Sequence, residues 1–324
     1  MIRRSRRRGL SLVELLVVMG IIGLLVSFLL PAVQAAREAA RGSSCSGHLR
    51  QIALALASYE EVHQYVPPAI SPILDFDTKT LLYDRNLSAL AQLLPYLDQG
   101  ALYDRIDLSE NGSGARNEPP TSGVNADLLR AHVSVFACPS DDVPQGGTSY
   151  RICDGTTHGS GIAWTWGRPL VKVRDGRSQT VFFSERVTGD RDRSEYSPWR
   201  DQARTRARLP DPAPTRRAIL DFIESTCRAP AAVIEGHFSY LGSTWLLTDV
   251  LHTCYNHALG PNSRIPDCRA APDGYGAVSA RSHHPGGVYV VMGDGATRFV
   301  NDSIDLAVWR GLATIDAGET LPDF

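Results

Sequence analysis

The chain has 324 residues, which is enough for one membrane segment and a globular part of one or two domains. Hydrophobic residues make up 43% of it and charged residues 21%, so the composition excludes a wholly disordered chain. The six cysteines are too few for a small cysteine-rich scaffold, and the net charge of −2 argues against a general nucleic-acid-binding protein. We therefore expect no nucleic-acid partner.

The chain begins with a basic head that is followed by an apolar run. Five arginines stand among residues 3–8, and residues 10–30 read LSLVELLVVMGIIGLLVSFLL, with Glu14 as the single charge. As a helix this run is about 30 Å long, which matches the hydrocarbon core of a bilayer. It is longer than the apolar core of an ordinary signal peptide, about 7–15 residues. The sequence therefore predicts a transmembrane helix over residues 10–30.

The arginines also predict the orientation of this helix, because positively charged flanks stay in the cytoplasm. No second apolar run of comparable length follows in the sequence. We expect a single-pass protein of the inner membrane. Its N-terminus would be cytoplasmic, and its C-terminal domain would be periplasmic or at the cell surface.

Glu14 is unusual in such a helix, because a carboxylate costs about 2.5–3.5 kcal/mol at the bilayer centre and less near its edge. One interpretation is a glutamate that reaches the headgroups. A second interpretation comes from the residues around Glu14, since RRRG-LSLVELL resembles the type IV prepilin motif. That resemblance implies cleavage by a prepilin peptidase between Gly9 and Leu10, followed by methylation of the new amino group. It also implies that Glu14 pairs with the terminal amine of a neighbouring subunit during filament assembly, where each charge neutralises the other.

Beyond the membrane segment we expect the helix to continue through Pro31 and to end before Pro67 and Pro68. Gly42 and Gly47 are expected to loosen it.

Apolar residues at helical spacing predict a stripe near the end of this helix that packs on a globular domain: Leu49, Ile52, Leu56 and Tyr59. The sequence thus divides into a leader at residues 1–9, an N-terminal helix at 10–66 and an extracytoplasmic globular domain at 67–324.

The globular part is predicted to contain short strands, loops and a few helices. Residues 87–106 are leucine-periodic and indicate helical turns, and residues 216–228 indicate a short helix. β-branched and aromatic residues predict strands at 133–139 and 179–187. Residues 188–217, which are charged and contain prolines, predict a solvated loop.

A β-hairpin is predicted near the end of the chain. Two apolar runs, at 288–292 and 296–301, flank an Asp-Gly pair, which is the strongest short hairpin signal. Asp294 suits the turn through hydrogen bonds to its own backbone, and Gly295 can supply a positive φ.

Several segments across the chain resemble a family of bacterial pilin-like proteins, the domain of unknown function 1559. His284 is followed by nine residues and then by Asp294-Gly295, which fits the C-terminal signature of that family. Other segments of similar character are PAVQAAREAAR, HLRQIALALASY, LLPYLDQ, FACPSD, VRDGRSQTVFFSER and YNHALGPNSRIPDC. The resemblance implies an α+β, pilin-like fold, in which a long N-terminal transmembrane and amphipathic helix packs on a mostly antiparallel β-sheet head. It implies no activity.

The cysteines are candidates for disulfides. Neighbouring cysteines are at least fourteen positions apart, so there is no C-x-x-C motif, and an even number in an exported domain favours disulfides. Sequence alone does not choose among the fifteen ways to pair six cysteines. Cys45 and Cys138 are one candidate pair, and a second pair is expected among Cys227, Cys254 and Cys268.

We expect no metal site and no cofactor. His284, Asp294 and Glu185 are weaker candidates for metal ligands, because a hairpin can bring such side chains near each other. In the favoured interpretation, Asp294 stabilises the hairpin turn and His284 makes hydrogen bonds within a loop. The sequence contains no phosphate-binding loop, no H-E-x-x-H and no G-x-S-x-G, so we expect no enzyme.

Three functions stay open at this point. The leading hypothesis is an N-methylated pilin-like or pseudopilin subunit of a pilus or of a type II secretion-like filament. Its partners would be the inner membrane, prepilin peptidase and other pilin-like subunits. The alternatives are a membrane-tethered exported binding module and a soluble periplasmic enzyme. The enzyme would be released by ordinary signal peptidase after Val33-Gln34-Ala35 and would start at Ala36.

Overall fold

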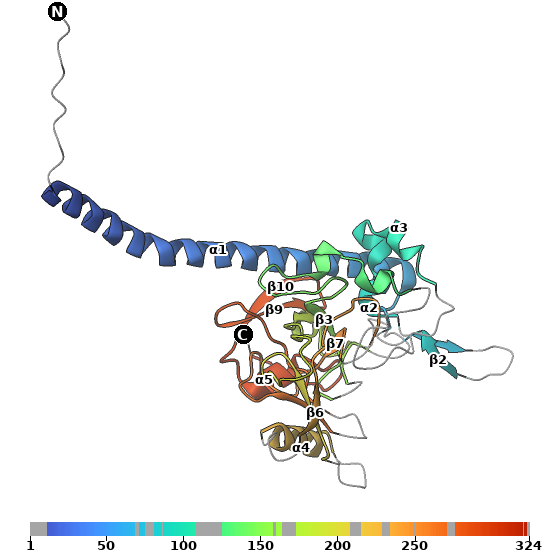
Figure 1. The fold of residues 1–324 in the computed structure, drawn as a ribbon. Helices are drawn as coiled ribbons and strands as arrows, with labels where there is room; N and C mark the ends of the chain where they lie inside the picture. The colour runs from blue at the N-terminus through green and yellow to red at the C-terminus, as the bar shows by residue number, and fades with distance from the viewer. Residues whose placement is uncertain are drawn as a thin grey trace, which may run out of the picture. The chain divides into compact units, whose positions relative to one another are not determined.

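The computed structural model describes residues 12–68, 71–74, 81–85, 87–107, 125–157, 160–163, 173–207, 215–228, 234–248, 251–270, 276–319 and 321–322. The chain divides into two compact units, Met1–Ser43 and Ser44–Phe324. Helix α1, Leu12–His63, begins in the first unit and ends in the second, which is called the head below (Figure 1).

Helix α1 continues through Pro31, as the sequence predicts. It also runs through Gly42 and Gly47 without a break, so the expectation of a loosened segment there is wrong. A glycine costs a helix only about 1 kcal/mol, and the burial of Cys45 and Leu49 against the head offsets that cost. The helix ends at His63, where Gln64 takes a positive φ of 64°.

The main sheet of the head has five strands in the order β10-β9-β4-β3-β7. Only β3 and β7 pair in parallel within it, and the other neighbours are antiparallel. The strands are β3 (Tyr150–Cys153), β4 (Val181–Glu185), β7 (Cys254–Tyr255), β9 (Gly287–Met292) and β10 (Thr297–Asn301). Both β3 and β4 are buried along their whole length, so this sheet forms the centre of the head. The structure therefore confirms the strand predicted at 179–187 and the hairpin predicted near the end of the chain.

The last turns of α1 pack on this centre through the predicted apolar stripe. Its four residues are each at most 5% exposed: Leu49, Ile52, Leu56 and Tyr59. They share one hydrophobic core with Phe183 of β4 and Val290 of β9. The fold is therefore the predicted α+β type, in which a long N-terminal helix carries a mostly antiparallel head.

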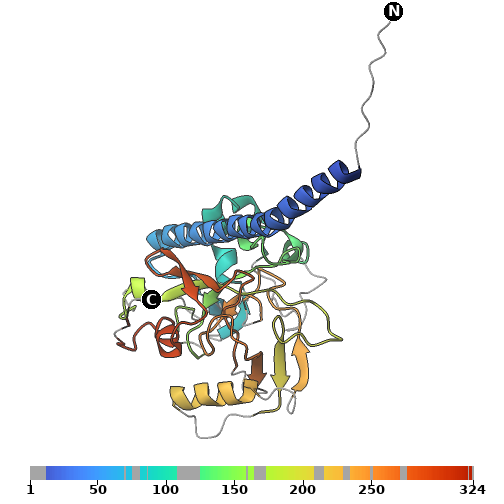
Figure 2. The same ribbon diagram turned by 90° about the vertical axis from the view of Figure 1, so that its left-hand side faces the viewer.

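A second sheet has three strands in the order β6-β5-β8, namely β5 (Gln202–Thr205), β6 (Ile234–Phe238) and β8 (Asp267–Ala270). Helix α4, Arg216–Arg228, lies beside this sheet (Figure 2). It packs on the sheet through Leu220, Ile223 and Cys227. The helix confirms the prediction for residues 216–228. The prediction of a solvated loop over 188–217 is wrong in part, because β5 lies within it.

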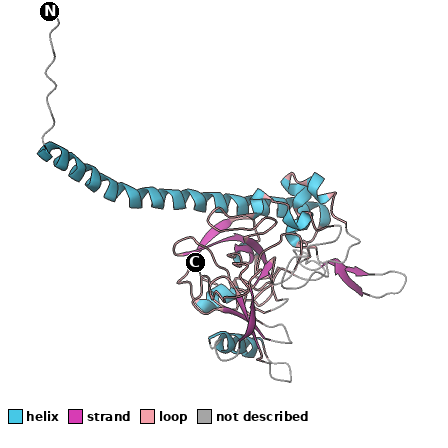
Figure 3. Cartoon of the chain, viewed as in Figure 1, coloured by secondary structure: helices cyan, strands magenta, loops and turns pink. Residues whose placement is uncertain are grey.

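Short elements complete the described part of the chain, and loops join many of them (Figure 3). Strands β1 (Ser71–Leu74) and β2 (Leu81–Arg85) pair antiparallel. The helical elements are α2 (Ala89–Gln92), η1 (Leu94–Leu97), α3 (Gly100–Tyr103), η2 (Leu128–Arg130), η3 (Ser134–Phe136), η5 (Arg177–Gln179) and α5 (Leu306–Gly311). The first three confirm the helical prediction for 87–106. The strand predicted at 133–139 is wrong, because η3 occupies its centre.

Candidate functional site

The membrane-length helix is the first candidate. Within the described residues, α1 is the one helix long and apolar enough to cross a membrane. Its large apolar side chains from Leu12 to Leu30 are each at least half exposed. Glu14 lies in the first turn of α1, where a negative charge interacts favourably with the helix dipole. The predicted processing residues, Gly9 and Leu10, lie outside the described residues.

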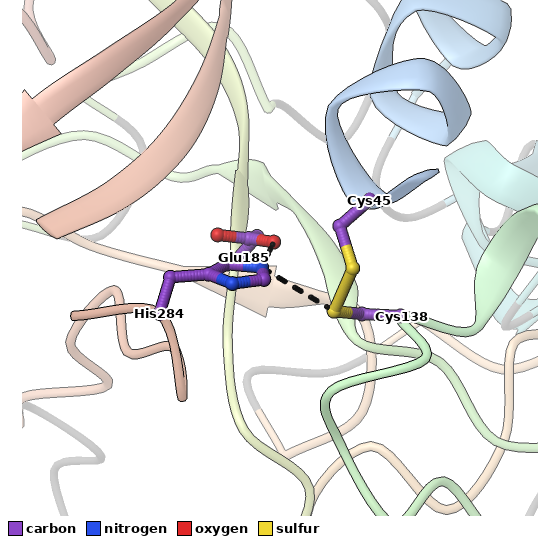
Figure 4. A group of neighbouring side chains, drawn as sticks. All are labelled: Cys45, Cys138, Glu185 and His284. Carbon is purple, nitrogen blue, oxygen red and sulfur yellow. Dashed lines mark hydrogen bonds and ion pairs between the residues drawn. A yellow bond between two sulfur atoms is a disulfide. The ribbon is translucent and has the colours of Figure 1, made fainter. Parts of the chain in front are cut away.

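The second candidate is a buried cluster inside the head, formed by Cys45, Cys138, Glu185 and His284 (Figure 4). One ligand-type atom from each of the four side chains lies within 4.8 Å of those of the others. Cys45 and Cys138 form a disulfide. The Nε2 atom of His284 lies 3.2 Å from Glu185 Oε1 and 3.6 Å from Cys138 Sγ. We call these four residues the CCEH cluster.

Local structure explains how each residue reaches the CCEH cluster. Cys45 lies four residues before Leu49 and so extends the buried stripe of α1 by one turn. Cys138 follows η3, and Glu185 is the last residue of β4. His284 precedes β9, and its backbone N–H donates a hydrogen bond to Ser282 Oγ at 3.1 Å. The segment that holds His284 is fixed beside Glu185 at both ends, because the Arg281 N–H donates to Glu185 O at 3.1 Å and the Tyr289 N–H donates to Glu185 Oε2 at 2.8 Å.

The carboxylate of Glu185 is fully desolvated, and burial raises its pKa above the usual value. The neighbouring His284 imidazole and a 2.8 Å hydrogen bond from the Tyr289 N–H to Oε2 oppose this rise. The other oxygen, Oε1, lies at ion-pair distance from His284 but is not aligned for a hydrogen bond. The cluster therefore contains a buried acidic group that is only partly stabilised.

The cysteine predictions can now be compared with the structure. The Cys45–Cys138 bond is the first predicted pair. The second bond joins Cys227 of α4 to Cys268 of β8, which is one of the pairs that the sequence left open. Cys254 lies buried in β7 and is in neither bond.

Asp294 does not join the CCEH cluster. It lies exposed in the turn between β9 and β10, where its Oδ1 accepts a 2.9 Å hydrogen bond from the Ala296 N–H. His284 precedes β9 and Asp294 follows it, so a strand about 20 Å long separates them. The idea that the hairpin brings these two side chains together is therefore wrong. Gly295 has the expected positive φ, of 87°.

Sequence reasoning missed a buried charge cluster between the two sheets. Arg186 and Arg281 contact Asp267 at 2.9 and 3.4 Å, and all three side chains are at most 1% exposed. Burial alone would raise the pKa of Asp267, but the two arginines and hydrogen bonds from Ser279 lower it below the usual value. Because Arg186 follows β4 and Asp267 begins β8, this cluster ties the second sheet to the main one. No local sequence pattern marks these residues.

Comparisons with known proteins agree with the two resemblances. A family model described as a protein of unknown function (DUF1559) matches residues 34–307. A model of the prokaryotic N-terminal methylation motif matches residues 4–30. No curated protein and no solved structure matches the chain. The methylation motif and the apolar helix together support membrane association and processing by a prepilin peptidase, as in type IV pilin-like subunits.

Proposed function

We propose a structural function for this chain, which belongs to the DUF1559 family of proteins of unknown function. It is a type IV pilin-like or pseudopilin subunit that assembles through its N-terminal helix. A prepilin peptidase removes residues 1–9, and the amino group of Leu10 is methylated. The match to the methylation motif at residues 4–30, over the start of an apolar helix, is the observation that carries this proposal.

The proposal places the helix in the inner membrane and the head outside the cytoplasm. The arginines before the helix support this orientation through the positive-inside rule. The two disulfides of the head support it as well, since such bonds persist in oxidising compartments. The proposal assigns the subunit no catalytic activity and no cofactor.

We propose that assembly depends on the charge of Glu14 and on the exposed apolar surface of helix α1. After cleavage, Glu14 is the fifth residue of the chain, within reach of the terminal amine of a neighbouring subunit. A buried carboxylate and a buried amine are tolerable in an apolar environment when they neutralise each other. The half-exposed apolar side chains from Leu12 to Leu30 supply the area on which neighbouring helices pack.

Replacement of the carboxylate in Glu14→Leu tests this proposal. We expect membrane insertion to be unchanged or improved, because a costly charge is removed from the apolar segment. We expect cross-linked oligomers to be lost, because the amine of the neighbour has no partner. Cross-linking of intact cells measures assembly, and membrane fractionation measures insertion.

Ser27→Leu is the matched control, since it also replaces a polar side chain in α1 by leucine but removes no charge. It should assemble like the wild type. If Glu14→Leu assembles as well as Ser27→Leu, the glutamate only reaches towards the headgroups. A membrane-tethered binding module would then be the better-supported function.

A further inference from the structure

The CCEH cluster combines two sulfur atoms, an imidazole nitrogen and a carboxylate oxygen, which is a donor set suited to zinc. We propose that the dithiol form of Cys45 and Cys138, together with Glu185 and His284, binds one Zn²⁺ ion. The Cys45–Cys138 disulfide and the metal are then alternative states of the same cluster. This inference concerns the head alone and does not depend on processing or assembly.

The distances fit tetrahedral zinc coordination. Zinc bonds of about 2.0–2.2 Å to nitrogen and oxygen and about 2.3 Å to sulfur place N and O about 3.4 Å apart, and N and S about 3.6 Å apart. The corresponding distances in the cluster are 3.2 Å from His284 Nε2 to Glu185 Oε1 and 3.6 Å from His284 Nε2 to Cys138 Sγ. The oxidised head therefore already places His284 Nε2 at ligand spacing from both Glu185 Oε1 and Cys138 Sγ.

Two of the ligands are held in place independently of the disulfide. Glu185 ends β4, and the Tyr289 N–H of β9 fixes its Oε2 at 2.8 Å, so Oε1 is the oxygen that faces His284. His284 is anchored through Ser282, whose hydroxyl accepts from the His284 N–H and donates to Gly287 O at 2.7 Å. Such supporting hydrogen bonds orient metal ligands and raise metal affinity.

The charges also favour a cation at this position. A disulfide has no hydrogen to donate, and Glu185 Oε1 lacks an aligned hydrogen bond although its side chain is only 2% exposed. A Zn²⁺ ion would coordinate this oxygen and would supply a positive charge beside a buried carboxylate. Zinc is preferred to calcium or magnesium here, because thiolates suit soft or borderline cations.

Metal and disulfide exclude each other. Two thiolates on one tetrahedral zinc lie about 3.8 Å apart, which is too far for a sulfur–sulfur bond. A disulfide donor R–S–S–R converts the zinc form into the oxidised form by thiol–disulfide exchange. The two thiolates form the Cys45–Cys138 bond, the R–S–S–R bond breaks, two RS⁻ ions carry away the electrons, and Zn²⁺ is released.

The test uses the full chain in detergent, isolated with a phosphine reductant and freed of metal with EDTA. After addition of Zn²⁺ and removal of excess, elemental analysis should find one zinc per reduced chain and none per oxidised chain. Co²⁺ in place of Zn²⁺ should give the thiolate charge-transfer and tetrahedral d–d absorption bands. The proposal is overturned if reduced wild-type chain with native circular dichroism binds no zinc.

Variants then assign the ligands. Glu185→Gln and His284→Ala should each weaken zinc binding at least about tenfold and change the cobalt spectrum. The matched control replaces Cys227 and Cys268 by serine, because this pair also becomes a dithiol on reduction but belongs to no comparable group among the described residues. That control should keep one zinc. Equal zinc affinity in wild type and both ligand variants, or loss of zinc only in the control, would contradict the assignment.

Discussion

Gly295 illustrates how one residue fixes the β9–β10 turn. Its φ is 87°, and a Cβ built at this position meets no atom within 4 Å. A substitution therefore strains the backbone without a steric clash elsewhere. The adjacent Asp294 supports the same turn through its bond to the Ala296 N–H.

We expect Gly295→Val to lower the free energy of unfolding by about 1–3 kcal/mol, because a β-branched residue tolerates positive φ poorly. Urea denaturation of the full chain in detergent measures the loss. Gly295→Asn is the control and should lose less, since asparagine adopts this conformation more readily. Equal stability of the valine variant and the wild type would show that the turn does not require the glycine.

His257 is a buried histidine whose surroundings fix its protonation state. Its Nδ1 lies 2.6 Å from the carbonyl oxygen of Trp309, which can only accept, so Nδ1 carries the proton. Its Nε2 then accepts from the hydroxyl of Tyr255 at 2.9 Å. The ring also stacks on Trp309 with centroids 3.5 Å apart. Burial lowers the pKa of His257 to about 3, so the folded head keeps it neutral.

This shift predicts a pH dependence of stability. Between the ordinary pKa of 6.5 and the folded value of about 3, the unfolded chain binds a proton that the folded chain does not. The contribution of His257 is therefore fully present above pH 6.5 and is lost as the pH falls, by about 1.4 kcal/mol per pH unit. Urea midpoints from pH 7.5 to 4.5 should fall more steeply for the wild type than for His257→Gln.

The comparison has to be made at each pH, because Asp201 acts in the opposite direction. Burial raises the pKa of Asp201 to about 6, so its folded form gains stability as the pH falls. The wild type and His257→Gln both contain Asp201, so the difference between their urea midpoints at one pH reports on His257 alone. Identical pH profiles for the two chains would contradict the account of a neutral buried histidine.

At the scale of elements, the stability of the short helix α5 depends on its N-cap residue. Asp305 precedes the helix, and its Oδ1 accepts hydrogen bonds from the N–H groups of Ala307 and Val308 at 2.8 and 3.2 Å. Trp309 of this helix is fully buried and contacts His257, so the cap positions part of the core.

Loss of this cap in Asp305→Ala should lower the free energy of unfolding by about 1 kcal/mol. Asp305→Ser should lose less, since a serine hydroxyl can accept the same bonds. Chemical denaturation of both variants beside the wild type measures the difference. If the serine variant is as unstable as the alanine variant, the cap does not stabilise the helix through these bonds.

Elements with a clear local pattern were predictable from the sequence. Helix α4 has apolar residues on one face, and β9 and β10 flank a turn that has its own chemistry. Strand β5 was not predictable, because its sequence is polar and its burial depends on distant partners. Gln202 donates to Ala277 O at 2.9 Å and Thr205 donates to Arg269 O at 3.4 Å. Pairing with strands far along the chain leaves no local signal.

The apolar run at 133–139 was predicted as a strand, but the structure has none there. Its composition suits a strand, but short apolar runs do not distinguish a strand from a buried turn. In the structure Val133 and Phe136 are buried three residues apart, which is the spacing of η3. The CCEH cluster was not predictable as a group either, because its members come from four separate segments. The sequence names each of them as a candidate, but only the fold brings them together.

At the scale of the whole molecule, the two units have different surfaces. The described part of the first unit presents a long apolar helix, and the sequence before it holds five arginines. The head has its own core and two disulfides, of which Cys45–Cys138 closes a loop of 93 residues. In the chain-entropy treatment such a loop stabilises the head by about 4–5 kcal/mol. A membrane-length helix and a separate disulfide-bonded head are the parts expected of the proposed pilin-like subunit.

The central claim is prepilin-type processing, and mass spectrometry of the N-terminal peptide from membranes tests it most directly. The account predicts that the mature chain starts at Leu10 and carries one methyl group on its amine. It also predicts that Gly9→Leu keeps the arginine leader and stays in the membrane. A mature chain that starts at Ala36 would contradict the account, as would normal maturation of the Gly9→Leu variant.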